Sequence, residues 1–346
     1  MNAEGMPNIV VPTCRDAEHF EKFLEHWCEE FKGCHVIILE DRKKSILKDR
    51  PMYLYESKLG KLLDMYLDSY EVHDWRSIEK DLGKDAWIIS RKSCAIKSYG
   101  IYRAWKNKAL FTVLLDDDTR PERPGHIKEF YNRLFNTKFE DTPREDFYST
   151  LKKELPRGTP HGSMARVGVI HGGWLRCADL TAEDQIKNYG RYGRSSKNDF
   201  NEGTIPEGVF YSMCGMNLAF RTELSNLMYF GLNGHMKKGK KMTAVPVNRC
   251  DDIWAGFFSK PRMDKQYYSV YTGEPYVIHE RASNVWESRK AEKRCESMTG
   301  DFLNMMRKGA SITPAPKEWF PNNEAEYWNG LAEAYKIWEA LFKNER

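Results

Sequence analysis

The chain is 346 residues long, with 41% hydrophobic residues, 13% aromatic residues and a net charge of +4. This composition excludes a disordered or low-complexity chain, because it supplies enough apolar surface for a sizeable core. The small positive charge allows an anionic partner but does not require one. The length fits one large α/β domain with an appendage, or two ordinary domains.

No segment of the sequence indicates a membrane span or a secretory signal. No apolar run approaches the roughly 20 residues that a membrane helix needs, and residues 1–16 lack a basic region followed by an apolar stretch. None of the eight cysteines belongs to a C-x-x-C pair. We therefore expect a cytoplasmic protein with mostly reduced, buried cysteines, and neither a zinc site nor a disulfide framework.

The N-terminal third alternates apolar runs with helical patterns. The apolar runs that predict strands lie at residues 8–12, 35–39 and 110–115, with 86–90 as a further candidate. Helical patterns begin at Asp16, with an apolar stripe that ends at Phe31, and again over residues 94–106. This alternation predicts an α/β fold with a largely parallel sheet, which binds ligands at the carboxyl ends of its strands.

The remainder is less regular until its last segment. Residues 119–165 and 186–206 have loop-like compositions, and apolar patterning returns at 209–220 and 253–258. Residues 324–343 predict a helix with one large apolar stripe, formed by Trp328, Leu331, Tyr335, Trp338 and Phe342. Such a stripe must be buried. Burial on the parent domain is the favoured interpretation, and the alternative is a homo-oligomer formed through this helix.

Three consecutive aspartates, Asp116, Asp117 and Asp118, directly follow the strongest strand signal and are called the Asp triplet below. Carboxylates at a strand end can hold a divalent cation, and that cation can neutralise a diphosphate leaving group. The alternative is an acidic turn that starts a loop. Because adjacent like charges repel, the triplet favours metal binding over simple solvation.

A second acidic pair, Asp251 and Asp252, is called the Asp pair. It precedes an apolar segment, so it is interpreted first as the N-terminal cap of a buried helix. The alternative is a general base or an acceptor-binding group.

Four other residues are candidates by their local context. His279 ends an apolar run, and would be a ligand for a manganese-like cation if the fold placed it beside the Asp triplet. Arg157 heads a turn where a guanidinium could contact phosphate or sugar. His171 and Trp174 flank two glycines, a pattern that suits close approach to a sugar ring or a packed loop.

Two basic stretches are the only features that suggest nucleic acid. Lys237, Lys238, Lys240 and Lys241 cluster in one, and Lys187, Arg191, Arg194 and Lys197 alternate with tyrosines in the other. Solvated loops are the favoured interpretation, and a phosphate-contacting surface with stacking tyrosines is the alternative. The sequence contains no P-loop, G-x-G-x-x-G or G-x-S-x-G motif, which removes support for several enzyme classes.

Several segments together resemble one family. Residues 212–220 (SMCGMNLAF), 228–232 (MYFGL) and 251–256 (DDIWAG) are similar, in the same order, to segments of the reversibly glycosylated polypeptides, whose plant members are UDP-arabinopyranose mutases. Residues 12–16, 35–41 and 90–100 resemble the segments around the family's first strands, and His279 with residues 282–284 resembles its H-x-x-A-S-N. The resemblance covers roughly residues 8–290.

The resemblance implies a GT-A glycosyltransferase fold, in which a Rossmann-like nucleotide half and an acceptor half share one sheet. We expect a nucleotide-sugar domain over residues 1–290, with halves at about 1–120 and 121–290, and a C-terminal helical extension over 291–346. The resemblance also implies a UDP-sugar ligand and Mn²⁺ or Mg²⁺ as the cofactor.

The implied roles follow from matching positions. The metal ligands are Asp116, Asp118 and His279. The catalytic positions are Arg157, which matches the reversibly glycosylated arginine, together with Asp251, Asp252 and Arg166. The nucleotide-sugar-binding positions are Thr13, Arg15, Asp41, Lys92, Lys97, Asp116, Asp117, His171, Trp174, Cys214, Gly215 and Asn217.

The chain departs from the plant pattern on the acceptor side. The segment between Arg157 and His171 is shorter, so the family's second arginine has only Arg166 as a candidate. Two glycines precede Trp174 where plants have Gly and Leu, and the loop before Asp251 is longer and carries the first lysine cluster. The nucleotide side matches throughout.

The leading hypothesis is therefore a metal-dependent UDP-sugar mutase that interconverts pyranose and furanose forms, with reversible glycosylation of its own arginine. The alternative is a glycosyltransferase with an external acceptor, such as a modified base in DNA of the phage type; nucleic acid is a partner only in that case. A non-catalytic nucleotide-sugar-binding subunit is a third hypothesis, which the intact Asp triplet disfavours.

Overall fold

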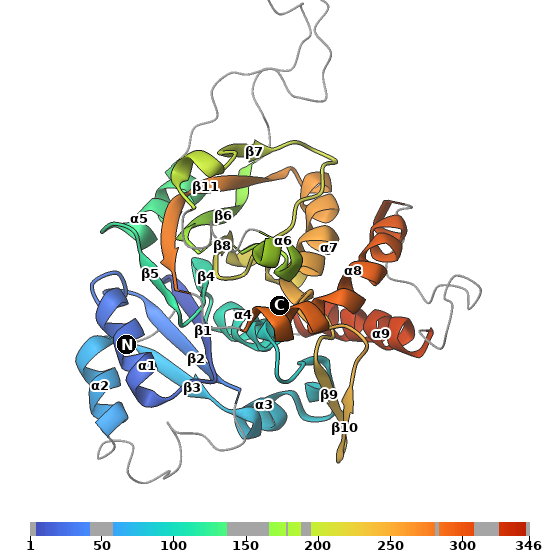
Figure 1. Cartoon of the computed structure of the whole chain (residues 1–346). Helices are drawn as coiled ribbons and strands as arrows, with labels where there is room; N and C mark the ends of the chain where they lie inside the picture. The colour runs from blue at the N-terminus through green and yellow to red at the C-terminus, as the bar shows by residue number, and fades with distance from the viewer. Residues whose placement is uncertain are drawn as a thin grey trace, which may run out of the picture.

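The computed structural model describes residues 5–41, 58–136, 166–177, 179–187, 195–280, 284–307 and 325–343. One central sheet, flanked by helices, organises these residues (Figure 1). Its strands run in the order β3-β2-β1-β4-β8-β6-β11-β5, with β7 also paired to β11. The strand bounds are β1 (Asn8–Thr13), β2 (His35–Glu40), β3 (Tyr70–His73), β4 (Phe111–Leu115), β5 (Thr119–Pro121), β6 (Arg166–Arg176), β7 (Gly203–Ile205), β8 (Asn217–Arg221) and β11 (Tyr268–His279).

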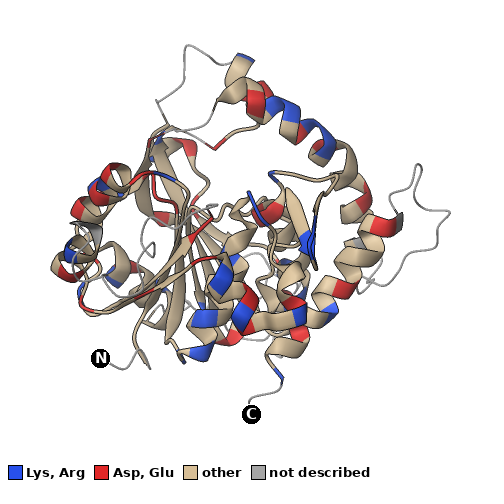
Figure 2. Cartoon of the chain, turned by 90° about the horizontal axis from the view of Figure 1, so that it is seen from below, with Lys and Arg blue, Asp and Glu red and all other residues tan. Residues whose placement is uncertain are grey.

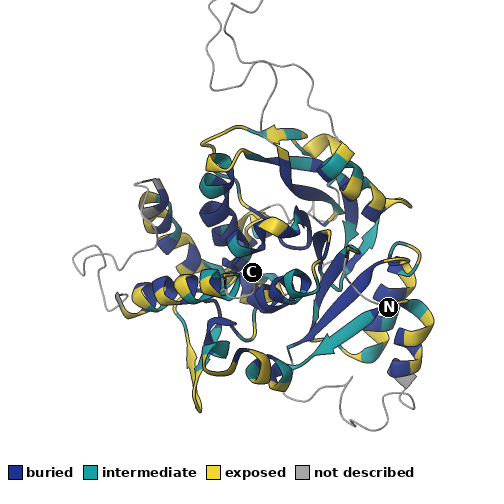
Figure 3. Cartoon of the chain, turned by 180° about the vertical axis from the view of Figure 1, so that it is seen from behind, coloured by how far each residue is buried: buried dark blue, intermediate teal, exposed yellow. Residues whose placement is uncertain are grey.

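The N-terminal half of the sheet is parallel. β1 pairs in parallel with both β2 and β4, and β2 pairs in parallel with β3. β1, β2 and β4 are buried almost throughout, which explains their continuous apolar runs (Figure 3). Their carboxyl ends therefore meet at one edge, where Asp41 and the Asp triplet follow β2 and β4.

The second half changes direction. β8 is antiparallel to both β4 and β6, whereas β11 is parallel to β6 and antiparallel to β5 and β7. The described sheet thus has equal numbers of parallel and antiparallel pairings and is mixed, not largely parallel as expected. The expected α/β architecture is confirmed, since a Rossmann-like half and a second half share one sheet, the arrangement that the GT-A resemblance implied.

Helices cover both faces of the sheet. They are α1 (Ala17–Trp27), α2 (Lys58–Tyr66), α3 (Trp75–Leu82), α4 (Lys97–Lys106), α5 (His126–Tyr131), α6 (Ala182–Lys187), α7 (Asp251–Lys265), α8 (Val285–Arg307) and α9 (Ala325–Leu341). α1 starts where predicted, because the Asp16 side chain caps it by accepting from the backbone N–H of His19. Basic and acidic residues are interspersed along the helices in Figure 2. None of the described helices is long and apolar enough to cross a membrane.

The strand candidate at residues 86–90 is wrong. This segment lies mostly in the 3₁₀ helix η1 (Gly83–Ile88), whose Trp87 and Ile88 are buried in the core. The third parallel strand is instead β3, whose four residues are only half-buried. A short run of β3's composition, without apolar continuity, gives no strand signal, whereas buried apolar residues cluster in a 3₁₀ helix as readily as in a strand.

The C-terminal aromatic stripe packs on the chain itself, as the favoured interpretation held. In α9, Trp338 stacks on Tyr229, and Tyr335 lies against Phe258 of α7. Trp328 stacks on Trp254, also of α7. The stripe is therefore not available as a subunit interface. The boundary expected at residue 290 falls inside α8, which packs against α7.

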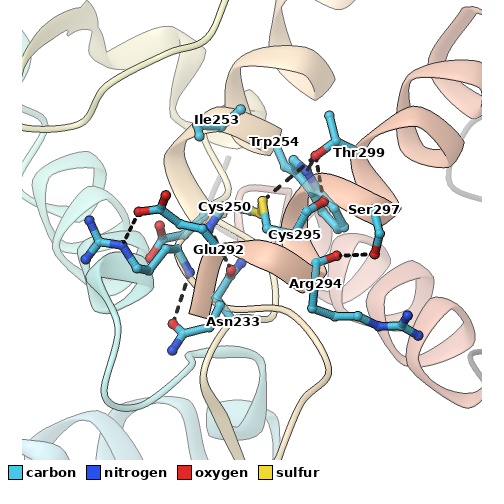
Figure 4. Close-up of a disulfide and its surroundings, with 12 residues drawn as sticks. Asn233, Cys250, Ile253, Trp254, Glu292, Arg294, Cys295, Ser297 and Thr299 are labelled. Atoms are coloured by element: carbon cyan, nitrogen blue, oxygen red, sulfur yellow. Dashed lines mark hydrogen bonds and ion pairs between the residues drawn. A yellow bond between two sulfur atoms is a disulfide. The ribbon is translucent and has the colours of Figure 1, made fainter. Parts of the chain in front are cut away.

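The expectation of mostly reduced cysteines is confirmed for six of the eight, and one pair departs from it. A disulfide joins Cys250, at the start of α7, to Cys295 in α8, with the two Cα atoms 6.1 Å apart (Figure 4). The other six cysteines are free thiols. The sequence gives no sign of this pair, since a separation of 45 residues matches no known cysteine spacing pattern.

Candidate functional site

The Asp triplet and the Asp pair meet at the carboxyl edge of the sheet. Lys97, fully buried in α4, donates from Nζ to Asp116 and to the carbonyl of Gly215 (2.8 Å). The backbone N–H of Gly215 in turn donates to Asp252 Oδ2 (2.9 Å). One lysine and one glycine peptide thus connect the end of β4 to the start of α7. Sequence reasoning could list these residues but could not place them together.

The absence of a side chain at Gly215 leaves room for this close approach. A Cβ at position 215 would lie 3.1 Å from the Phe230 ring and 3.4 Å from Lys97 Nζ. Lys97 itself has a raised pKa: burial, the largest influence, lowers it, but the charge of Asp116 and the surrounding hydrogen bonds outweigh burial. Lys97 is therefore a permanent internal cation that neutralises Asp116, not a mobile side chain for phosphate.

Arg15 and Thr13 hold the other two carboxylates of the triplet. Arg15 Nε lies 3.1 Å from Asp117 Oδ1, and its Nη2 donates to Asp118 Oδ2 (2.8 Å). Thr13 Oγ1 donates to Asp117 Oδ2 (2.7 Å). Burial nevertheless raises the pKa of Asp117 to about 6, with Arg15 and Thr13 opposing the rise.

His279 reaches the triplet from the end of β11. Its Nε2 lies 3.7 Å from Asp118 Oδ2, and its Nδ1 contacts the carbonyl of Cys177 (2.9 Å). Burial lowers the pKa of His279, but the bonds to Asp118 and Cys177 outweigh burial and raise it to about 11. The fold therefore supplies the context that the lone histidine lacked in the sequence.

Asp118 and His279 fit a divalent cation. Two ligand atoms 3.7 Å apart can share one ion at ordinary coordination distances of roughly 2.1 Å. If a cation replaced the proton on Nε2, the Cys177 carbonyl would keep the remaining proton on Nδ1, and Nε2 would face the ion beside Asp118. No group of three or more His, Cys, Asp or Glu converges among the described residues. Mg²⁺-type ions commonly take only one or two protein ligands and complete their shell with phosphates and water.

The Asp pair opens α7, as predicted, and is strongly perturbed. Asp251 is buried, and Asp252 is half-buried. Burial is the main cause that raises the pKa of Asp252 to about 7, and the charges of Asp251 and Asp179 add to it. A carboxyl group with such a pKa can both accept and return a proton near neutral pH. The helix-cap interpretation and the acid–base interpretation thus apply to the same residues.

Asp41 marks a separate part of the same edge. Its side chain accepts from Trp75 Nε1 (2.8 Å), and its backbone N–H donates to the carbonyl of Thr13 (3.1 Å). The Arg91 guanidinium lies 4.0 Å from the centre of the Trp75 ring. Burial raises the pKa of Asp41, against the hydrogen bond from Trp75. A carboxylate beside an aromatic–guanidinium stack suits a planar base.

Three predicted ligand residues instead support the site. His171 is buried: its Nε2 accepts from the backbone N–H of Cys214 (3.0 Å), and its Nδ1 lies 3.2 Å from Thr272 Oγ1. Asn217 donates to the carbonyls of Gly173 and Pro275 and accepts from His126 Nε2. The protein therefore uses all the polar atoms of both side chains. Cys214 donates from Sγ to Asp179 Oδ2 (3.2 Å).

Three other predicted positions make no contact with the Asp triplet or the Asp pair within the described residues. Trp174 is half-buried and packs its ring on His171 and Phe200. Lys92 is exposed, next to Arg91. Arg166 is at the wrong end of β6 for a catalytic role: it lies five residues before His171, about 16 Å along the strand, on the exposed amino end.

Arg157 lies outside the described residues, as do Arg191 and Arg194 of the second basic stretch. Part of the first lysine cluster is neutralised on the protein. The cluster occupies the hairpin of β9 (His235–Lys238) and β10 (Lys241–Ala244), where Lys237 Nζ lies 2.5 Å from Glu79 Oε1 and Lys238 Nζ lies 4.7 Å from the centre of the Trp87 ring.

Sequence reasoning missed several residues at this edge, notably Trp75, Cys94, Asp179 and Arg249. None belongs to a motif with a stated chemistry. Arg249 is marked only by its position two residues before the Asp pair, and Asp179 only by its contact with Cys214, which the fold creates. An aromatic residue two positions after a strand, as Trp75 is after β3, is a weak signal that could have been noted.

Comparison with known proteins shows the family of this chain. A sequence profile described as "Reversibly glycosylated polypeptide" matches residues 3–311. The chain belongs to the reversibly glycosylated polypeptide family. It is 33% identical to the probable UDP-arabinopyranose mutase 1 of Pisum sativum, over 82% of this chain and 72% of that protein. It is 30% identical to the probable UDP-arabinopyranose mutase 4 of Arabidopsis thaliana, over 96% and 88%.

Two glycosyl-transferring enzymes of known structure are similar at low identity. One is glucosyl-3-phosphoglycerate synthase from Mycobacterium tuberculosis, with 11% identity and a TM-score of 0.43 over 86% of this chain and 81% of that chain. The other is a mannosyltransferase from Pyrobaculum calidifontis in complex with GDP-Man and Mn²⁺, with 12% identity and a TM-score of 0.39 over 99% and 88%.

Proposed function

We propose that this protein is a UDP-sugar enzyme of the mutase type, which interconverts pyranose and furanose forms of the sugar. The observation that carries the proposal is the link from the Asp triplet through Lys97 and Gly215 to Asp252. This link supports a single site with a diphosphate-handling end and an acid–base end. Membership of a family whose relatives include UDP-arabinopyranose mutases indicates the substrate class.

The nucleotide binds along the carboxyl edge of the parallel half. The uracil base lies beside Asp41, Trp75 and Arg91, and the diphosphate lies beside Arg15 and the Asp triplet. Asp118 and His279 hold Mn²⁺ or Mg²⁺, which supplies charge neutralisation for the departing diphosphate when bound. Lys97 keeps Asp116 neutralised without occupying the open face of the site.

Asp252 transfers protons to and from the oxygens of the sugar. Pyranose–furanose interconversion replaces the ring oxygen at the anomeric carbon by another hydroxyl oxygen of the same sugar. The incoming hydroxyl must lose a proton, and the departing ring oxygen must gain one. A carboxyl group with a pKa of about 7 suits both transfers. The sugar must also be shielded from water while it is detached, because hydrolysis would compete.

Arg157 is the proposed site of reversible self-glycosylation, on the strength of the family motif alone.

The test of both proposals is to incubate the protein with Mn²⁺ and UDP-arabinopyranose and to follow products by liquid chromatography and intact mass. We expect UDP-arabinofuranose, and a sugar-sized mass gain that the Arg157→Ala variant loses. Binding of the UDP-sugar without any furanose product would contradict the mutase proposal. Furanose formation without a mass gain would contradict only the self-glycosylation.

A glycosyltransferase with an external acceptor is the second candidate. Lys240 and Lys241, which are exposed at the tip of the β9–β10 hairpin, are the observation that favours it. Lys237 of the same hairpin already pairs with Glu79, which reduces the positive charge that the hairpin can offer to phosphates. Transfer of sugar to added DNA, abolished by Glu at positions 240 and 241, would establish this candidate over the mutase.

A further inference from the structure

Arg249 has a strained backbone at the start of the acid–base end. It lies two residues before the Asp pair's first member, with φ = 62°, in the left-handed region that residues with a side chain rarely adopt. Such a conformation costs on the order of 1 kcal/mol or more, and persists where surrounding contacts determine it. Contacts around Arg249 must therefore hold its backbone in this conformation.

Glu292 of α8 fixes the direction of the Arg249 side chain. Its Oε1 accepts from Arg249 Nε (3.1 Å), and its Oε2 accepts from the backbone N–H of Ala182 (2.6 Å). Figure 4 shows Glu292 close to the Cys250–Cys295 disulfide, which ties the same two elements together. The Glu292 carboxylate thus holds both the loop before α7 and the start of α6 in position.

The two terminal nitrogens of the guanidinium have no acceptor among the described residues. Within the described part of the chain, Arg249 hydrogen-bonds through Nε to Glu292, and its side chain keeps 40% of its surface exposed. A planar fork with its stem fixed and its two ends open is preorganised to bind a ligand.

Arg249 lies next to the Asp pair, because it precedes Asp251 by two residues at the start of α7. The charge of Arg249 interacts with Asp179 and with Cys94. Cys94 is solvent-exposed, yet it is close enough to Asp116 and both members of the Asp pair for their charges to act on its thiol. Cys94 therefore lies near both ends of the site, and Arg249 lies near Cys94.

We propose that Arg249 contacts the sugar of the UDP-sugar and determines specificity for it, with Asp179 as its neighbouring acceptor. A sugar hydroxyl both donates and accepts, and an arginine fork beside a carboxylate supplies both kinds of partner. The diphosphate has its own cation, Arg15, at the other end of the site. This assignment rests on the UDP-sugar site proposed above, and deepens it.

Binding measurements separate a contact with the sugar from a contact with the UDP part of the ligand. Titration calorimetry with UDP and with UDP-arabinopyranose, each with Mn²⁺, is carried out on the wild type and on Arg249→Ala. We expect Arg249→Ala to bind UDP-arabinopyranose about tenfold or more weakly, and UDP within about twofold of the wild type. Because binding is measured without turnover, the result does not depend on whether the protein is a mutase. If the wild type binds neither ligand, the UDP-sugar site itself fails.

Two further variants keep the test decisive. Arg249→Gly removes the fork but suits the left-handed backbone, so it should fold at least as well and show the same selective loss. Arg123→Ala, which removes a comparably exposed arginine from an ion pair with Glu274, should leave both affinities unchanged. Equal losses for UDP and UDP-arabinopyranose, or no loss for either in Arg249→Gly, would overturn the assignment.

Discussion

At the residue scale, the site combines groups whose ionisation the protein sets by burial. Lys97 and Asp116 form an internal ion pair that also organises the Gly215 peptide. Asp252 receives a hydrogen bond from that peptide but remains close to Asp251 and Asp179, whose negative charges disfavour its ionisation. The protein thus holds one carboxylate neutralised and keeps the other near the point of titration.

Asp252 should control both activity and stability. We expect kcat of the wild type to rise with pH through about 7, as Asp252 ionises, and Asp252→Asn to lose about 100-fold or more of the rate. Its folded pKa lies above the unfolded value of 3.8, so ionisation destabilises the folded state as pH rises from about 4 to 7.

Asp252→Asn should therefore increase the free energy of unfolding at pH 8, on the order of 2 kcal/mol. Urea unfolding and pH–rate profiles check both effects. Asp301→Asn, an exposed change in α8, is the control and should alter neither. A variant that is inactive and also less stable than the wild type at pH 8 would contradict the proposed ionisation.

At the element scale, α9 packs against α7, the helix that carries the Asp pair. α7 carries the Asp pair at its N-terminus, where the helix dipole favours negative charge. α9 buries its aromatic stripe against α7 and the segment around Tyr229. Tyr229 in turn donates to the carbonyl of Ile88 in η1 (2.6 Å). The C-terminal helix therefore stabilises the elements beneath the site.

Trp338→Ala should show how much α9 contributes. Trp338 is fully buried, stacks on Tyr229, and donates from Nε1 to the carbonyl of Asn226 (3.1 Å). Its loss should lower the free energy of unfolding by about 3–5 kcal/mol, through a cavity and an unpaired carbonyl. Chemical denaturation measures the change. Trp286→Ala removes a tryptophan that is 57% exposed, and should cost little; equal effects of the two would mean that α9 is not part of the folded core.

At the scale of the whole molecule, two buried histidines, His126 and His171, form hydrogen bonds that connect the elements around the second half of the sheet. His126 of α5 contacts Asn217 Oδ1 (3.0 Å), and Asn217 reaches β6 and the chain of β11 through Gly173 and Pro275. His171 holds Cys214 from β6. Burial lowers the pKa of both histidines to about 4.

The molecule should consequently lose stability in mild acid. In the unfolded chain each histidine titrates near 6.5, so between pH 6.5 and 4 the unfolded state binds more protons and stability falls as pH falls. Each histidine should contribute about 3 kcal/mol to this loss. Urea unfolding at pH 7 and pH 5 measures the first part of this loss, about 2 kcal/mol for each histidine. His126→Gln keeps an N–H donor but cannot titrate, so its stability should fall less over this range; an unchanged pH dependence would count against the role of His126.

The sequence by itself determined much of the nucleotide side. Continuous apolar runs predicted β1, β2 and β4 because parallel strands are buried on both faces, and Asp16 predicted the start of α1 because its capping is local. The family segments placed the Asp triplet, the Asp pair and His279. These signals lie within a few neighbouring residues, so no knowledge of tertiary contacts was needed.

Only the tertiary structure decided what those residues do together. Lys97 and Asn217 matched ligand positions, yet their partners lie far along the chain and turn them into internal supports. The Cys250–Cys295 disulfide and the orientation of Arg249 by Glu292 depend on how α8 packs beside α7. Such contacts arise from packing between distant segments, and a one-dimensional pattern does not encode which distant side chain fills a given space.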